Sequence, residues 1–417
     1  MKKKDTIGII GLGYVGLPLA RLFATKYAVV GFDVNQTRIR ELRQGEDTTQ
    51  EVSKALLESV YLSENTNEVG LFYSSESQDL KDCTHFIVTV PTPVDKNNRP
   101  VLTPLIKASE TVGGVMKKGA IVVYESTVYP GATEEDCVPV LENVSGLKFN
   151  EDFFVGYSPE RINPGDKNHT VEKIKKVTSG SNVESAINID NLYKSVIIAG
   201  THLAPSIKVA EAAKVIENTQ RDLNIALVNE LKVIYEKMGI DVWEVIEACS
   251  TKPFGFMPFF PSIGVGGHCI PVDPTYLSYI SEKFGMEAKF INLANAVNSN
   301  RPKKIALRIK EELCGSLLNK RIQIAGIAYT PDVSDLRESP ALQLIDELID
   351  AGAKVSWFDP LVQNYNNQNS EPLNPNIDIG LIVTPHSQID FSIWKEANVK
   401  VLDLSANSIN YGWPKFL

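Results

Sequence analysis

IIGLGYVGLPLA, residues 9–20, places Gly11, Gly13 and Gly16 between a predicted strand and a predicted helix. In this GxGxxG pattern the first glycine permits a tight turn, the second lets the backbone approach a pyrophosphate, and the third allows the helix to pack closely. A second predicted strand ends at Asp33, whose carboxylate can accept hydrogen bonds from a ribose diol and would repel a 2′-phosphate. The stretch therefore predicts a dinucleotide site that favours NAD, although Arg38 nearby leaves NADP open.

Strand-like and helical stretches alternate at both ends of the chain. Before about residue 200 the strand-like runs are TIGIIGLG, AVVGFDV, HFIVTVPTP, AIVVYEST, FFVGYSP, KKVTSG and SVIIAG. From about residue 320 they are KRIQIAGIAY, AKVSWFDP, IDIGLIVTP and VKVLDLS. Such alternation is typical of a parallel sheet with helical crossovers.

The middle of the chain has a different pattern. Residues 207–239 carry apolar side chains at helical spacing without a proline, which predicts one long helix. We therefore expect an α/β chain with two Rossmann-like doubly wound domains joined by a central helical domain with one long helix. The expected domains are residues 1–200, 201–315 and 316–417. The asparagine-rich stretch 363–376 is expected to be a surface loop.

The composition excludes several classes of protein. The net charge of −9 and the pI near 5.3 argue against a general nucleic-acid binder. The chain has no run of 18 apolar residues and no signal peptide after its basic first residues, so we expect a cytoplasmic protein without a membrane segment. Its five cysteines lack CxxC spacing and its five histidines lack metal-ligand spacing, so no disulfide framework or metal site is expected.

Two features of the helical middle suggest chemistry. The loop GVGGHCIPVDP, residues 264–274, surrounds Cys269 with glycines and prolines, and so few side chains would let another molecule approach the sulfur. The alternative is a buried loop thiol. Lys214 and Asn218 lie four residues apart on one face of the predicted long helix, where they could polarise a substrate oxygen and position a water. The alternative for this pair is a solvated helix face.

Other candidates follow the predicted strands. Glu160 and Arg161 lie in a loop beyond one strand, where they could contact a ligand or form a surface ion pair. Thr127 follows another strand and could contact a cofactor or cap the next helix. Arg337 precedes a helix, where its guanidinium could bind a phosphate or a hydroxyl-rich ligand, or form a salt bridge with Asp335 or Glu338.

Seven motifs occur in one order along the chain: GLGYVGLPLA, VTVPTP, ESTVYPGAT, SPERINPG, AAKVIENTQRDLNIALVNE, GVGGHCIPVDP and DLRESPA. In this order and spacing the chain resembles the UDP-glucose/GDP-mannose dehydrogenase family, the nucleotide-sugar 6-dehydrogenases, nearly from end to end. The wording of SPERINPGDK and GGHCIPVDP is most similar to the bacterial branch that acts on UDP-N-acetylhexosamines.

The resemblance implies a four-electron oxidation of the sugar C6 alcohol to a carboxylate, with two NAD and no metal. Cys269 would be the nucleophile, which binds the aldehyde as a thiohemiacetal and then becomes a thioester. Lys214 and Asn218 would stabilise the oxyanion and hold the water. The other catalytic positions that the family implies are Asp273, Glu160 and Thr127.

The resemblance also implies two sets of binding positions. Those for NAD are Gly11, Gly13, Tyr14, Val15, Gly16, Asp33, Arg38, Pro91, Thr92 and Thr127. Those for the nucleotide sugar are Glu160, Arg161, Lys214, Asn218, Phe260, Gly266 and Arg337. The chain departs from the family pattern at Thr330, where relatives usually have lysine, and at Phe260, where some have arginine. Both departures concern substrate choice.

The resemblance favours UDP-GlcNAc as the substrate, then UDP-GalNAc, and implies a homodimer that forms through the long helix and supplies surface polysaccharide precursors. UDP-glucose and UDP-ManNAc are the alternative substrates. A single-step β-hydroxyacid dehydrogenase would share the glycine turn and the Lys-Asn helix but has no use for the Cys269 loop. A noncatalytic dinucleotide or redox sensor is the alternative from another class of protein.

Overall fold

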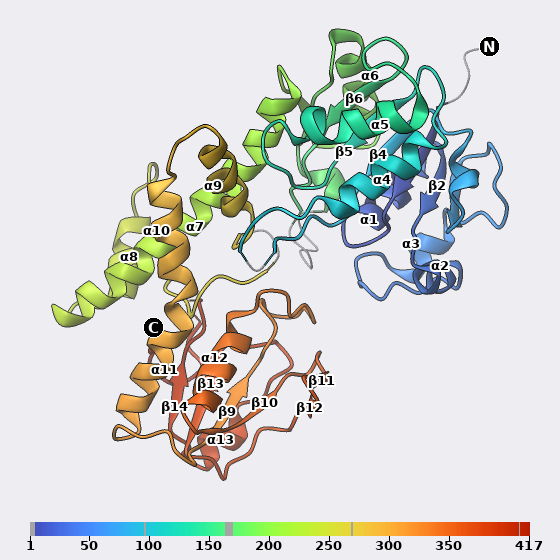
Figure 1. Cartoon of the computed structure of the whole chain (residues 1–417). Coiled ribbons are helices and arrows are strands. Elements are labelled where there is room, and N and C mark those ends of the chain that lie inside the picture. The colour runs from blue at the N-terminus through green and yellow to red at the C-terminus, as the bar shows by residue number, and fades with distance from the viewer. Residues whose placement is uncertain (1–4, 96, 163–169, 268–269, 408) are drawn as a thin grey trace. The chain divides into compact units, whose positions relative to one another are not determined.

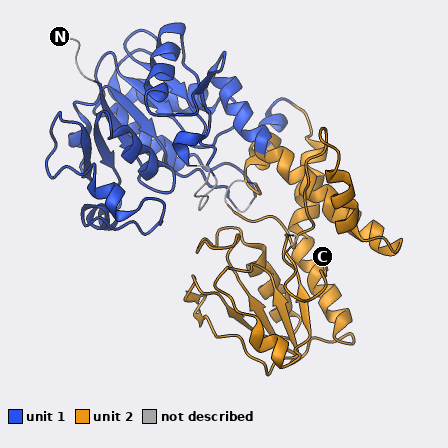
Figure 2. Ribbon diagram, turned by 180° about the vertical axis from the view of Figure 1, so that it is seen from behind, with its two compact units in different colours: residues 1–217, 279–284 blue, residues 218–278, 285–417 orange. Residues whose placement is uncertain are grey.

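Alternating strands and helices divide between two units of the chain (Figure 2). The computed structural model describes residues 5–95, 97–162, 170–267, 270–407 and 409–417. The first unit contains residues 1–217 and 279–284, and the second contains residues 218–278 and 285–417. The division into three domains near residues 200 and 315 stays a prediction.

The first unit is built on a six-stranded parallel sheet with the order β3-β2-β1-β4-β5-β6 (Figure 1). This is the doubly wound order in which the direction of winding reverses between β1 and β4, and ligands bind at such a reversal beyond the carboxyl ends of the strands. The strands are buried because helices flank a sheet of this type on both faces. They are β1 (Thr6–Ile10), β2 (Ala28–Phe32), β3 (Gly70–Ser74), β4 (His85–Val88), β5 (Ile121–Tyr124) and β6 (Phe154–Tyr157).

The helices of this unit connect successive strands. The third glycine of the GxGxxG pattern, Gly16, begins α1, as the sequence predicts. The helices are α1 (Gly16–Phe23), α2 (Gln36–Arg43), α3 (Lys54–Glu58), α4 (Thr103–Gly113), α5 (Val138–Ser145) and α6 (Val183–Lys194). Short helical turns of other types are η1 (Ser77–Leu80), η2 (Thr133–Cys137) and η3 (Val171–Lys173).

One predicted strand is wrong. The run SVIIAG, residues 195–200, forms the turn after α6, and the strand β8 (Thr201–Leu203) follows it and pairs with β7 (Lys176–Thr178). The run is apolar because Val196 and Ile197 pack into the core of the first unit. Conversely, β3 was not predicted. Its five residues GLFYS are a short apolar run that follows a polar stretch, and so few residues give a weak strand pattern.

The second unit contains a smaller parallel sheet with the order β10-β9-β13-β14. Its strands are β9 (Arg321–Ala325), β10 (Lys354–Phe358), β13 (Ile379–Ile382) and β14 (Val401–Asp403), and its flanking helices are α11 (Arg301–Glu312), α12 (Pro340–Asp350) and α13 (Ser392–Glu396). The asparagine-rich stretch is not purely loop, because it forms a short hairpin of β11 (Asn364–Tyr365) and β12 (Gln368–Asn369).

The predicted long helix is confirmed as α7 (Ile207–Lys237), which has 31 residues and passes from the first unit into the second (Figure 1). Three further helices complete the helical part: α8 (Val242–Ser250), α9 (Asp273–Lys283) and α10 (Lys289–Ser299). The expected fold class, with two doubly wound sheets and a long helix between them in the sequence, is therefore confirmed.

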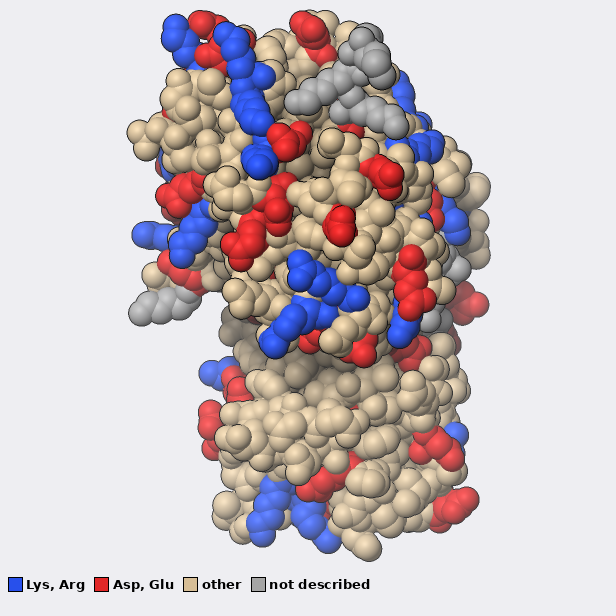
Figure 3. All heavy atoms as spheres, turned by 90° about the vertical axis from the view of Figure 1, so that its right-hand side faces the viewer, with Lys and Arg blue, Asp and Glu red and all other residues tan. Residues whose placement is uncertain are grey.

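The surface carries charges of both signs. On the face shown in Figure 3, acidic and basic side chains are interspersed. Within the described residues, no helix has both the length and the apolar character that crossing a membrane requires. The same residues contain no group of three or more His, Cys, Asp or Glu side chains placed to hold a metal ion.

Candidate active site

Each of the three glycines in the turn after β1 has a different structural reason. Gly11 has a φ of +94°, a conformation that favours glycine. A Cβ atom on Gly16 would lie 1.9 Å from the carbonyl oxygen of Gly11, so α1 begins against the turn itself. A Cβ on Gly13 would meet nothing within 4 Å. The turn therefore needs Gly16 for its own packing, whereas the space at Gly13 suits the approach of a pyrophosphate.

Asp33 and Arg38 support this turn in different ways. The backbone N–H of Leu12 donates to Oδ2 of Asp33 at 2.9 Å, and Asp33 remains partly exposed at the end of β2. The side chain of Arg38 is buried, and its Nε donates to the carbonyl oxygen of Leu12 at 3.0 Å. Its Nη2 forms a 2.7 Å salt bridge with Asp47. Because the guanidinium is held inside the unit, it does not supply a cation for a 2′-phosphate, and the residues present fit NAD.

The loops after β4 and β5 are joined beside the turn. The hydroxyl of Thr92 donates to the carbonyl oxygen of Thr127 at 2.7 Å, and the hydroxyl of Ser126 donates to that of Val90 at 2.6 Å. Tyr14 and Val15 are partly exposed before α1, and Pro91 is exposed after β4. These predicted cofactor positions therefore gather at the carboxyl ends of neighbouring strands, where the winding reverses.

The long helix α7 carries two of the predicted catalytic residues one turn apart. Lys214 and Asn218 are only 7% and 8% exposed, so they do not form a solvated helix face. The side-chain amide of Asn218 donates to Oδ2 of Asp273, which is fully buried at the start of α9, at 2.5 Å. The second unit thus brings together Asn218 and Asp273, which are 55 residues apart in the sequence.

Glu160 lies in a buried group of charges. Its Oε1 accepts hydrogen bonds from the backbone N–H groups of Arg161 and Ile162, at 2.6 and 2.7 Å. Its Oε2 accepts a hydrogen bond from Lys176 Nζ at 2.7 Å, and the same ammonium donates to Glu125 Oε2 at 2.7 Å. Sequence reasoning missed Lys176 and Glu125. The only available signal was that both residues occur within runs that were predicted to be strands.

Arg161 forms the ion pair that was considered as its alternative. Its guanidinium contacts Glu217 of α7 at 2.7 Å and donates to the carbonyl oxygen of Lys175 at 2.9 Å. A second carboxylate from α7, Glu211, is buried and accepts the backbone N–H of Gly131 at 2.6 Å. Burial raises the pKa of Glu211 to about 7. The N-terminal half of α7 is therefore fastened to two loops at the carboxyl edge of the first sheet.

The loop before Cys269 is packed against the turn after β9. The N–H of Gly267 donates to the carbonyl oxygen of Arg337 at 3.1 Å, and a Cβ on Gly266 would lie 2.8 Å from Cβ of Tyr329. The side chain of Arg337 forms a salt bridge with Asp335, as its alternative proposed, although 43% of that side chain stays exposed. Cys269 itself, with His268, lies outside the described residues.

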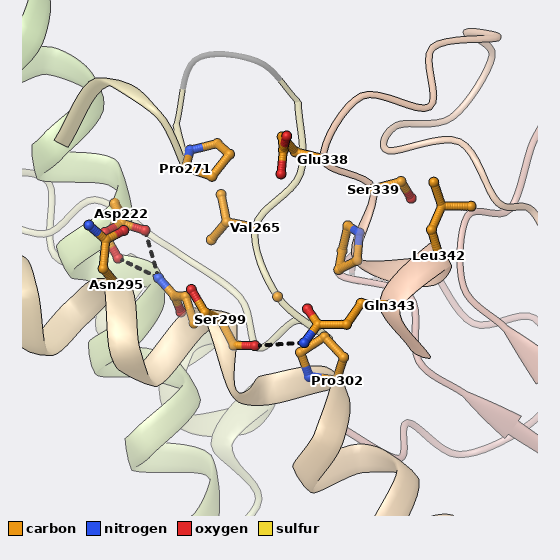
Figure 4. A pocket seen from close by; sticks show the side chains of 13 residues that line it. Asp222, Val265, Pro271, Asn295, Ser299, Pro302, Glu338, Ser339, Leu342 and Gln343 are labelled. Atoms are coloured by element: carbon orange, nitrogen blue, oxygen red, sulfur yellow. Dashed lines mark hydrogen bonds between the residues drawn. The ribbon is translucent and has the colours of Figure 1, made fainter. Parts of the chain in front are cut away.

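Phe260 lies in an aromatic environment. Its ring stacks on Trp243 with centroids 5.2 Å apart and planes at 15°. Both rings line a groove of about 950 Å³ that also includes Trp413 and Lys415. Gly264 and Val265 of the same loop instead line a pocket of about 310 Å³ (Figure 4). The second unit therefore places Phe260 and the residues just before Gly266 at two different hollows.

Asp222 is the most deeply buried acid of that smaller pocket. Its Oδ1 accepts a hydrogen bond from Asn298 Nδ2 at 2.8 Å, whereas Oδ2 has no hydrogen-bond partner among the described residues (Figure 4). Burial raises the pKa of Asp222 to about 6, and the hydrogen bond from Asn298 opposes this rise only in part. The carboxyl group is therefore destabilised when it ionises.

Sequence models of one family cover most of the chain. They match its NAD binding domain at residues 5–197, its central domain at 208–300 and its UDP binding domain at 323–407. The chain belongs to the UDP-glucose/GDP-mannose dehydrogenase family. As a member, it is an NAD-dependent oxidoreductase, and its first sheet is the one that binds NAD.

Individual members of the family are similar over nearly the whole chain. A UDP-N-acetyl-D-glucosamine 6-dehydrogenase of Pseudomonas aeruginosa is 49% identical over 411 residues, which cover 97% of this chain and 93% of the relative. One from Salmonella typhi is 49% identical over 364 residues, 85% of this chain and 82% of the relative. The structure of the UDP-D-ManNAc dehydrogenase from Pyrococcus horikoshii superposes with a TM-score of 0.85 at 30% identity, covering 99% and 97% of the two chains.

Substitutions at two glycines should separate folding of the NAD turn from NAD binding. Gly16→Ala should destabilise the first unit by at least about 1–3 kcal/mol, because its Cβ would overlap the carbonyl oxygen of Gly11. Gly13→Ala should leave the unfolding midpoint unchanged but weaken NAD binding by about tenfold or more, because a methyl group would fill the space for the pyrophosphate. Thermal unfolding and calorimetric titration with NAD measure the two effects. Wild-type affinity in Gly13→Ala would contradict this assignment of the turn.

Asp222→Asn should stabilise the protein at high pH. Because the pKa of Asp222 is raised from 3.8 to about 6, the folded state holds a proton that the unfolded state has lost, and stability falls as the pH rises through about 6. The amide keeps the acceptor for Asn298 and does not ionise, so the gain at pH 8 should be on the order of 2–3 kcal/mol and should vanish near pH 4. Urea unfolding at both pH values measures it. The exposed Asp346→Asn is the control, and an equal gain in both variants would refute this origin.

Proposed function

We propose that this dehydrogenase oxidises the C6 alcohol of a UDP-N-acetylhexosamine to a carboxylate, with UDP-GlcNAc favoured and UDP-GalNAc next. The observation that carries the proposal is the buried Asn218–Asp273 hydrogen bond one helical turn from the buried Lys214. The 49% identity to UDP-N-acetyl-D-glucosamine 6-dehydrogenases supports this choice of sugar. The product would be a uronic acid precursor for surface polysaccharide.

The residues of the helical part have separate tasks in this proposal. NAD, when bound at the glycine turn, accepts a hydride in each of the two oxidations. Cys269 adds to the C6 aldehyde after the first oxidation and retains it as a thiohemiacetal, which the second oxidation converts to a thioester. Water then releases the acid and regenerates the thiol. A covalent adduct suits two successive oxidations because the aldehyde never leaves the enzyme.

Polar groups of α7 would act on the oxygen atoms of the substrate. The ammonium of Lys214 stabilises the oxyanion at C6 as the carbon changes its geometry. The amide of Asn218 is oriented because its Nδ2 donates to Asp273, so Oδ1 is the end that accepts a hydrogen bond from a water or hydroxyl. Glu160, which takes part in hydrolysis of the thioester, completes the proposed set in the first unit together with Thr127 and Arg161. In the second unit the set is completed by Phe260, Gly266 and Arg337.

The stoichiometry of the reaction tests the proposal. With a panel of UDP-GlcNAc, UDP-GalNAc, UDP-ManNAc and UDP-glucose, we expect the highest kcat/KM for UDP-GlcNAc and two NADH for each sugar consumed. Absorbance at the NADH band and chromatography of the sugar nucleotide measure these quantities. One NADH per molecule would indicate a single-step dehydrogenase, and silence with all four sugars would favour a noncatalytic sensor.

The Cys269→Ser variant is the control for the covalent route. It should form no uronate with the preferred sugar while it binds NAD and the sugar nucleotide as the wild type does. Full activity in this variant would refute the thioester.

We also propose that the chain forms a homodimer through α7. Val209, Ile216, Leu227 and Ile234 are spaced by 7, 11 and 7 residues, which places them on one face of the helix, and each is between 44% and 54% exposed. Met238, which follows the helix at the next turn, is 63% exposed. A stripe of apolar side chains along a long helix is typical of an association surface.

Replacing Leu227 and Ile234 by glutamate should convert the dimer to a monomer. Sedimentation velocity should give about twice the chain mass of 46.0 kDa for the wild type and one chain mass for the double variant. Substituting the exposed Leu307 and Leu318 of the second unit is the control, since they lie outside α7. A monomeric wild type at micromolar concentration would contradict the proposed dimer.

A further inference from the structure

Glu160 belongs to a buried set of four polar side chains in the first unit. Glu125 follows β5, Lys176 begins β7 and Tyr193 belongs to α6, and each of these is at most 2% exposed. The hydroxyl of Tyr193 donates to Oε1 of Glu125, whose Oε2 accepts a hydrogen bond from Lys176. Lys176 then donates to Glu160, which is 8% exposed. Only Glu160 belongs to the proposed catalytic set.

We propose that Lys176 is a positioning residue that fixes the orientation and charge of Glu160, and that Glu125 and Tyr193 hold Lys176 in place. This inference rests on the proposed function, in which Glu160 takes part in hydrolysis of the thioester. No atom of Lys176 or Glu125 needs to touch the substrate for this role.

The contacts at Glu160 restrict both of its oxygens. Backbone N–H groups of Arg161 and Ile162 donate to Oε1, and the ammonium of Lys176 donates to Oε2. Two donors on one oxygen would still let the carboxylate turn about its bond to Cγ. The third donor, on the other oxygen, fixes the plane of the carboxylate, which is the condition for directing a water at a carbonyl carbon.

The carboxylate of Glu125 explains how a side chain as flexible as that of Lys176 can hold Glu160 in one orientation. A lysine side chain has four rotatable bonds and loses much conformational freedom when it is fixed. Glu125 receives the ammonium on one side and the hydroxyl of Tyr193 on the other. The ammonium is therefore held between two carboxylates that follow different strands, β5 and β6, and the contact with Glu125 restricts its movement away from Glu160.

The charges in this set support the assignment. Burial lowers the pKa of Lys176, but the two carboxylates outweigh it and raise the pKa above the usual value, so Lys176 stays charged. Burial would raise the pKa of Glu160, but Lys176 and the two N–H groups hold it below the usual value. Burial raises the pKa of Glu125 to about 7 in spite of Lys176. Near neutral pH it is thus Glu125 that changes its charge, while Glu160 stays ionised.

A role in stability alone would predict a different result. Buried ion pairs often stabilise a fold no better than apolar side chains of similar size, so a lysine between two carboxylates has no obvious advantage as a packing residue. If Lys176 only supported the fold, its replacement would lower stability and leave the individual chemical steps of the folded fraction unchanged. If it positions Glu160, the hydrolytic step slows in the folded enzyme.

The experiment uses the full-length enzyme with NAD and UDP-GlcNAc in rapid-quench and steady-state assays. In Lys176→Met/Glu125→Gln, which removes the ammonium together with the carboxylate that it would leave unpaired, we expect kcat to fall about 100-fold with KM changed less than about threefold. A burst of two NADH per site should persist, and intact-protein mass spectrometry should show the acyl-enzyme accumulating. Lys176→Arg should restore most of the rate, because a guanidinium can pair with both carboxylates.

Two further variants isolate the cause. Lys118→Met removes a lysine that pairs with Asp152 on the surface of the same unit, and it should behave as the wild type. Glu125→Gln should remove an inflection near pH 7 from the pH profile of kcat, because the pKa of Glu125 is about 7. The titratable groups that face Glu125 are Tyr193, Lys176 and Glu160, whereas Arg161 pairs with Glu217. Circular dichroism and NAD affinity show that each variant is folded.

The outcomes separate this inference from the proposed function. If the wild type forms no uronate from any UDP-sugar, the proposed function is overturned, and the role of Lys176 with it. If the wild type produces two NADH per sugar and the folded double variant hydrolyses its thioester at the wild-type rate, only the role of Lys176 is overturned. A slow variant without acyl-enzyme accumulation also contradicts it, because the defect would then lie before hydrolysis.

Discussion

One hydrogen bond fixes the glycine turn at the carboxyl edge of the first sheet. The backbone N–H of Leu12, just after Gly11, donates to the side-chain carboxylate of Asp33 at the end of the neighbouring strand. It sets the curvature of the glycine turn and at the same time fixes one oxygen of the carboxylate that would meet a ribose. The positive φ of Gly11 and the contact between Gly16 and the turn follow from that curvature. The shape of the glycine turn therefore depends on contacts within the protein itself.

The second sheet repeats the bond and uses it differently. Gly326 has a φ of +81°, and the N–H of Ile327 donates to Asp359 at 2.9 Å, as Leu12 does to Asp33. Asp359, however, is fully buried and pairs with His386 at 3.0 Å. Burial would raise the pKa of Asp359, but His386 and backbone N–H groups hold it below the usual value. An acid so enclosed serves the fold, and this contrast agrees with the family's division into an NAD binding domain and a UDP binding domain.

The sequence predicts features that depend on neighbouring residues and misses those that depend on distant partners. The glycine turn, the sheets and α7 follow from local spacing and apolar runs. By contrast, SVIIAG is apolar because it packs under the first core, which local pattern cannot distinguish from a strand. The ion pairs of Arg161 with Glu217 and of Lys176 with Glu125 join residues that are 56 and 51 positions apart. The place of Phe260 beside the nucleotide sugar was expected from the family resemblance and stays a prediction, whereas its stack on Trp243 has no signal in the sequence.

The long helix α7 buries a row of polar side chains and exposes a row of apolar ones, which is the reverse of an ordinary surface helix. Its buried face carries polar residues one or two turns apart, which are Glu211, Lys214, Asn218, Asp222 and Asn229. Four of them form hydrogen bonds within the unit to which they belong: with backbone N–H groups for Glu211, with Asp273 for Asn218, and with Asn298 for both Asp222 and Asn229. The opposite face carries the exposed apolar stripe.

Polar groups can be buried at little cost only when other groups satisfy them, which requires loops from both units to reach α7. That arrangement leaves no part of either unit to cover the apolar stripe among the described residues. The exposed stripe is the surface through which we propose that two copies of the chain associate, because a two-fold axis would let one stripe cover its own copy. The proposed site and the proposed association surface are thus two consequences of one amphipathic pattern.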